Sequence, residues 1–98
     1  MIQDQTKYFD RLSSHLLEFF GKKDNLKIFI FGSSVKSKKF GDIDVGIMGD
    51  VTDAQIRELK AYFEDSNFPF FVDIINFNKV EESFSKNVLT NQILWIKR

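Results

Sequence analysis

The stretch Ile28–Met48 reads IFIFGSSVKSKKFGDIDVGIM, and it decides the fold expected for this chain. An apolar run ends at Gly32-Ser33, a short basic loop follows, and Gly41-Asp42 opens a second apolar run. Short apolar runs bounded by glycine are typical of buried strands. About ten residues join the two runs, which is few for a parallel crossover. We therefore expect two strands that pair in antiparallel fashion.

Segments with helical periodicity surround these strands. Residues 4–20 place apolar side chains at three- and four-residue spacing, which predicts an amphipathic helix. Thr52 precedes Gln55 by three residues and indicates a capping box, so a second helix is expected to run to about Asp65. A third strand is predicted over residues 70–77 and a short helix over 79–86, whereas the tail, 88–96, fits either a helix or a strand. The order α-β-β-α-β-α predicts an α+β (mixed α/β) fold class.

Length and composition restrict the class of protein. A chain of 98 residues is expected to form a single domain, residues 1–98. The 14 basic residues balance the 14 acidic ones, so we expect no direct nucleic-acid partner. The absence of cysteine excludes disulfides and thiolate metal sites and fits a cytoplasmic protein. Apolar runs fall short of the roughly 20 residues that span a membrane, so no membrane association is expected.

Three acids carry the functional hypothesis. In a strand, side chains two residues apart point to the same face, so Asp42 and Asp44 share a face while Ile43 points into the core. Asp73 interrupts the apolar run of the third strand, and it can join the pair if that strand lies alongside. Such a cluster needs a cation, and Mg²⁺ prefers carboxylate and phosphate oxygens. Two ions about 4 Å apart can clamp the attacking and leaving oxygens of a phosphoryl displacement. Asp73 is the candidate general base.

Gly32 and Ser33 are the candidate phosphate-binding residues. Glycine lets the backbone turn sharply and approach a ligand closely. A helix beginning at Ser33 or Ser34 would point free N–H groups at an anion, and the Ser33 hydroxyl would add a donor. We expect these groups to hold the phosphates of a nucleoside triphosphate, with Lys36 neutralising the leaving pyrophosphate.

Each of these features also has a plainer interpretation when taken alone. An Asp-x-Asp pair is often turn chemistry, a Gly-Ser turn is common, and Asp73 can be a strand-edge carboxylate facing water. An EF-hand is excluded because Ile47 stands where that loop requires glycine. The occurrence of all three features in one short chain favours the functional interpretation.

The residues resemble a known superfamily. Gly32-Ser33, an eight-residue gap, Asp42-Ile43-Asp44 and a later Asp73 in a strand are similar to the pattern of DNA polymerase β-type nucleotidyltransferases. Within this superfamily, the sequence motif FGS…GDIDVGI resembles that of the minimal nucleotidyltransferases (MNT proteins). These proteins are commonly paired with HEPN-domain toxins as their antitoxins.

The resemblance implies a fold and an activity. It implies a mixed sheet flanked by helices, Mg²⁺ held by the three acids, and nucleotide bound at Gly32-Ser33. The implied activity is transfer of AMP from ATP to a hydroxyl, which in HEPN-paired members is a tyrosine of the toxin, whose ribonuclease is thereby silenced. A HEPN toxin is then the expected partner, in a hetero-oligomer. Relatives often have a gap nearer ten residues and carry Arg where this chain has Lys36, and Lys loses the planar fork that grips phosphate.

Three functions follow from this pattern. The first, which the resemblance implies, is a Mg²⁺-dependent protein adenylyltransferase that acts as an antitoxin. Little chain remains beyond the core to recognise an acceptor, which favours a partner protein that brings its own surface. The second is a nucleotidyltransferase on RNA or a small molecule that is completed by another subunit. The third is a non-catalytic module that inhibits its partner by contact alone.

Overall fold

The computed structural model describes residues 5–21, 23–32, 35, 42–91 and 93–98. Within them the elements follow in the order α1 (Gln5–Phe20), β1 (Leu26–Phe31), β2 (Asp42–Gly49), α3 (Asp53–Asp65), β3 (Phe71–Asn76), α4 (Glu82–Leu89) and β4 (Leu94–Lys97). The strands form one mixed sheet in the order β3-β2-β1-β4. The predicted α+β fold is therefore confirmed.

The sheet combines both kinds of strand pairing. β1 pairs with β2 in antiparallel fashion, as the short connection predicted, and β2 pairs with β3 in parallel. α3 provides the crossover that a parallel pair requires. The tail, for which the sequence left helix and strand open, divides into the end of α4 and strand β4, which pairs with β1. The expected order thus gains a final strand.

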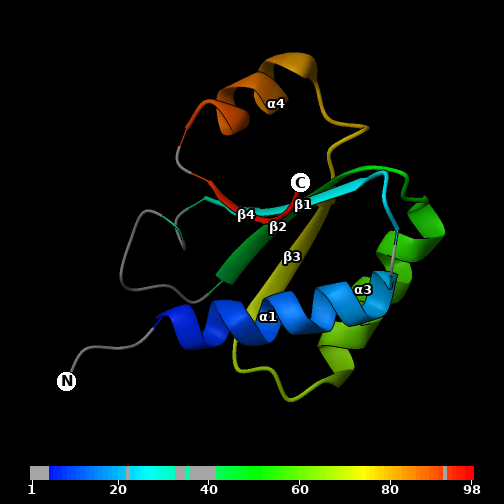
Figure 1. Cartoon of the computed structure of the whole chain (residues 1–98), viewed down its shortest axis with the longest axis vertical. Helices are drawn as coiled ribbons and strands as arrows, with labels where there is room; N and C mark the ends of the chain where they lie inside the picture. Colours follow the sequence, from blue (N-terminus) through cyan, green and yellow to red (C-terminus); the bar gives the residue numbers. More distant parts are fainter. Residues whose placement is uncertain (1–4, 22, 33–34, 36–41, 92) are drawn as a thin grey trace.

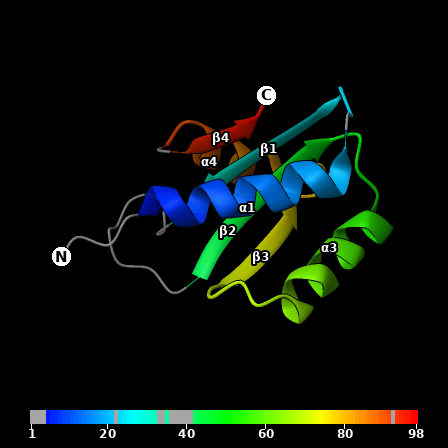
Figure 2. The same cartoon turned by 60° about the horizontal axis from the view of Figure 1, so that its bottom comes forward.

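Helices cover the two faces of the sheet unequally. Figure 1 shows α1 and α3 on one side of the strands and α4 on the other, and Figure 2 shows α1 lying across the strands with α3 beside β3. Leu12 and Leu16 of α1 and Leu59 of α3 are fully buried in the larger core, beneath the alternate strand residues Ile43 and Val45. Burial of a Leu or Ile side chain contributes about 1.5–3 kcal/mol, so this face holds the fold together.

A smaller aromatic core lies on the α4 face. Phe29, Phe31 and Phe77 are buried there, and Trp95 of β4 packs on Phe29 with ring centroids 5.3 Å apart. Neither apolar core includes the three acids Asp42, Asp44 and Asp73.

Local signals account for the ends of the elements. The Thr52 side chain accepts a hydrogen bond from the Gln55 backbone N–H at 3.1 Å, and the Gln55 side chain accepts one from the Thr52 N–H at 3.0 Å. This is the predicted capping box, and it satisfies two free donors at the start of α3. No helix in the described ranges combines the length and apolarity that crossing a bilayer demands.

Candidate active site

Strand alternation places Asp42 and Asp44 on the same side of β2. Ile43 and Val45, between and beyond them, are fully buried in the larger core. Asp42 at the strand start is exposed, whereas Asp44 is half-buried. The predicted division of this strand into an apolar face and an acidic face is therefore confirmed.

The parallel pairing of β2 and β3 brings Asp73 alongside Asp44. The two residues are Cα partners in the register, and each lies at the same level of the sheet. Neighbouring strands in a sheet are roughly 4.8 Å apart, and residues in register point to the same face. Asp73 is half-buried. Carboxylates that are separated by about thirty residues in the chain thus become neighbours in space.

The pKa of Asp44 reflects its burial and the nearby carboxylates. Burial raises the pKa of its carboxyl group above the ordinary value, and the negative charges of Asp73 and then Asp42 raise it further. Both causes act in the same direction because burial and neighbouring negative charges each disfavour the ionised form of this carboxyl group. The coulombic part of this shift shows that the negative charges of the three carboxylates act on one another.

The end of β1 completes the surroundings of Asp44. Gly32 directly follows β1, and its backbone has a φ of +83°, a value that favours glycine. The Asp44 carboxylate fills the space where a Gly32 side chain would stand. The backbone turn and the acid therefore lie against each other.

The predicted residues Ser33 and Lys36 lie outside the described residues. For the acids, the chemistry of the donor set fits Mg²⁺, which takes carboxylate oxygens and relieves their repulsion. As the side chains stand, no three Asp, Glu, His or Cys residues of the described ranges converge closely enough to hold a metal ion. The three acids Asp42, Asp44 and Asp73 therefore share a face, but their carboxylates do not surround a common position for an ion.

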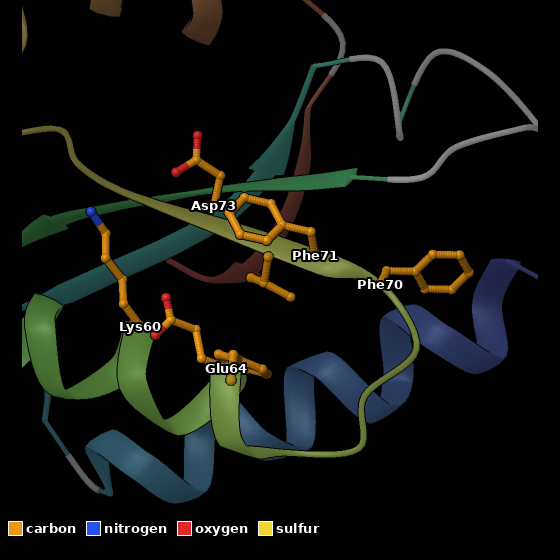
Figure 3. A pocket seen from close by; sticks show the side chains of 7 residues that line it. Lys60, Glu64, Phe70, Phe71 and Asp73 are labelled. Atoms are coloured by element: carbon orange, nitrogen blue, oxygen red, sulfur yellow. The ribbon is translucent and has the colours of Figure 1, made fainter.

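A pocket beside Asp73 was not anticipated from the sequence. Its volume is about 240 Å³, and it lies between α3 and β3 (Figure 3). Lys60 and Glu64 line it from α3, and Phe71 and Asp73 line it from β3. Two spacings in the sequence were available as signals: Phe71 is two residues from Asp73, and Lys60 is four residues from Glu64. Only the packing of α3 against β3 connects the two pairs.

Comparison with protein-family models identifies the type of domain that this chain forms. The family model for polymerase β nucleotidyltransferase domains matches residues 15–98, which include the strands and the three acids. This chain belongs to the polymerase β nucleotidyltransferase family. Membership establishes a nucleotidyltransferase domain, and it confirms the superfamily resemblance carried by Gly32 and the acids.

Solved structures share the fold of this nucleotidyltransferase domain. One is described as the tri-AMPylated Shewanella oneidensis HEPN toxin in complex with MNT antitoxin; a chain of it matches at 19% identity and a TM-score of 0.68, over 95% of this chain and 71% of that one. Another is a toxin–antitoxin crystal structure with AMP-PNP, at 18% identity and a TM-score of 0.66, over 86% of this chain and 71% of that one. No curated protein matches the sequence.

Proposed function

We propose that this chain is a Mg²⁺-dependent adenylyltransferase that transfers AMP from ATP to a tyrosine hydroxyl of a partner HEPN toxin and thereby acts as its antitoxin. The observation that carries the proposal is the register of Asp44 with Asp73 on parallel neighbours, with Asp42 two residues away on the same face. The fold is shared with chains of toxin–antitoxin structures, one with an AMPylated toxin and one with an ATP analogue.

The proposed reaction is an in-line displacement at the α-phosphorus of ATP. The acceptor oxygen forms a bond to this phosphorus, the bond to the oxygen bridging the α- and β-phosphorus breaks, and pyrophosphate leaves with the electron pair. Asp73 accepts the hydroxyl proton. When bound, Mg²⁺ supplies charge neutralisation to the phosphates, and Asp42, Asp44 and Asp73 are the residues that would hold it.

The nucleotide is assigned to the β1 side of the acids. Gly32 turns the backbone sharply at the end of β1, directly beside Asp44. Glycine has no side chain of its own to obstruct an approach of the phosphates to this turn. Ser33 and Lys36 remain the proposed further contacts to the phosphates. The protein partner supplies the acceptor.

The test is transfer of label from [α-³²P]ATP. The chain is incubated with Mg²⁺ and the protein encoded by the neighbouring gene, and label on that protein is measured. We expect the Asp42→Ala/Asp44→Ala variant to lose label transfer by more than about a hundredfold, as loss of transition-state charge stabilisation predicts. A matched control, Asp24→Ala/Asp50→Ala, removes two exposed carboxylates at the opposite end of the sheet and is expected to retain activity.

Two outcomes would contradict the proposal. If no label appears and the double acid variant neutralises the partner as well as the wild type does, the chain inhibits by contact. If label appears on added RNA instead of the protein, the acceptor is a nucleic acid. Formation of a labelled tyrosine, identified by mass spectrometry of the partner, supports the proposed acceptor.

A further inference from the structure

The order of the strands separates two flanks of the candidate active site. β2 lies between β1 and β3, so Asp44 has Gly32 on one side and Asp73 on the other. If the nucleotide occupies the β1 side, as the proposed function requires, the acceptor must reach the α-phosphorus from the side of β3. This side of approach rests on that proposed function.

On that side lies the pocket between α3 and β3. Four consecutive residues of the chain, 70–73, line it together with Lys60, Phe63 and Glu64. Consecutive strand residues point to alternate faces, so a pocket that touches all of them runs along the edge of the strand. β3 is the outer strand of the described sheet. An extended segment of another protein can therefore lie along this edge and end at Asp73.

Phe71, on this edge, is a large apolar side chain that is not buried in either core. Its side chain is 59% exposed, more than any other large apolar side chain of the described residues. It lies two residues from Asp73, on the same face, and its Cα partner on β2 is Asp42. Its neighbour Phe70 packs edge-to-face on Tyr8 at 4.9 Å. Within the ranges the structure describes, Phe71 has no such ring partner, so its face is available.

Two charges from α3 complete the pocket. Lys60 and Glu64 are four residues apart on the helix and exposed, and neither forms an ion pair with another described residue. Figure 3 shows the Lys60 side chain extending from α3 toward β3, while Asp73 and Phe71 project from the strand. One cation and one anion beside an apolar ring suit the polar backbone of a peptide whose side chain lies on that ring.

We propose that this pocket is the acceptor subsite and that Phe71 packs against the ring of the acceptor tyrosine. The occupant is a tyrosine-bearing segment of the partner protein that lies along β3. Ring-on-ring packing restrains the tyrosine so that its hydroxyl meets Asp73, and positioning of this kind favours one geometry of attack. Phe71 is thus a specificity-determining residue, and Lys60 and Glu64 orient the segment.

Single-turnover label transfer, measured against partner concentration, tests the subsite. Phe71→Ala is expected to lower the rate constant at saturating partner about fivefold to tenfold, the loss of one aromatic pair. Phe71→Trp keeps a ring and is expected to restore most of the rate. The affinity for ATP is expected to stay unchanged in both variants. Lys60→Ala/Glu64→Ala is expected to raise the half-saturating partner concentration about threefold, as exposed charges contribute little each.

Leu94→Ala is the matched control. It truncates a 40% exposed apolar side chain on β4, the strand at the other edge of the described sheet. Its rate constant is expected to equal that of the wild type. If the wild type labels its partner and Phe71→Ala does so at the same rate, the subsite is wrong while the proposed function stands. If Phe71→Trp is as slow as Phe71→Ala, ring packing is also contradicted. If the wild type transfers no label, the proposed function fails first.

Discussion

Gly32 and Asp44 occupy adjoining space at the end of the β1–β2 pair. A Cβ atom added to Gly32 would overlap Oδ2 of Asp44 and lie 3.4 Å from its Cγ. The backbone at Gly32 also has a φ of +83°, which side chains disfavour. A side chain at position 32 is therefore disfavoured for two reasons: the positive φ and the overlap with Asp44. The position of the Asp44 carboxylate therefore depends on glycine at position 32.

Gly32→Ala should damage both stability and activity. The left-handed backbone costs about 1–2 kcal/mol with alanine, and the added methyl group displaces the Asp44 carboxylate. We expect label transfer to fall by at least about tenfold, because a carboxylate moved by about 1 Å is a poor ligand. Urea unfolding and the labelling assay measure the two effects.

Gly21→Ala separates these two causes. Gly21 also has a positive φ, +64°, but nothing lies within 4 Å of the position of its Cβ. The variant should lose a similar amount of stability and keep its activity. A Gly21→Ala protein that is as inactive as Gly32→Ala would show that destabilisation alone explains the loss.

Asp44→Asn should stabilise the protein at neutral pH while abolishing transfer. The pKa of Asp44 is raised in the folded state by burial, Asp73 and Asp42, so the folded state binds this proton more tightly than the unfolded state does. Its contribution to stability is therefore present below the unfolded pKa, near 3.8, and is lost as pH rises through the folded pKa. The gain at pH 7 is small, since solvent screens this half-exposed group.

Thermal melting at pH 3 and pH 7 measures this effect. The gain of Asp44→Asn over the wild type should appear at pH 7 and vanish at pH 3. Millimolar Mg²⁺ should raise the melting temperature of the wild type and leave the variant unchanged, because a ligand stabilises only a state that binds it. A wild type that gains stability between pH 4 and pH 6 relative to Asp44→Asn would contradict the direction of the pKa shift.

Gly46→Ala should destabilise the aromatic core. Gly46 is buried on β2, and a Cβ there would overlap the Phe29 ring and lie 2.8 Å from Cε1 of Phe77. Overpacking of this kind costs about 1–3 kcal/mol. Combined with Phe29→Leu, which removes the ring that the new methyl group would overlap, the substitution should cost less than the sum of the two single changes. Additive costs in urea unfolding would show that the rings do not oppose the methyl group.

Asn78→Ala should loosen the far end of β2 without affecting transfer. The Asn78 side chain accepts a hydrogen bond from the Gly49 N–H at 3.0 Å and donates one to the Gly49 carbonyl at 2.9 Å. Loss of both should cost about 1–2 kcal/mol and speed amide exchange at Gly49. Asn67→Ala, an exposed asparagine in the turn before β3, is the control with no expected change. Unchanged exchange in Asn78→Ala would contradict this role.

Much of the fold follows from local patterns. Apolar runs bounded by glycine predicted β1 and β2, and the capping box at Thr52 predicted the start of α3. The tail was ambiguous because β4 spans only four residues, LWIK, too few to show a period. Its conformation is decided by the free edge of β1 and by the contact of Trp95 with Phe29.

The sequence by itself determined which acids share a face of β2, because alternation along a strand is a property of the local backbone. Only the tertiary structure placed Asp73 in register with Asp44 and Gly32 against that carboxylate. It alone opened the pocket between α3 and β3 beside Phe71. These relationships join segments that lie far apart in the chain, and they depend on how helices and strands pack, which no local spacing encodes.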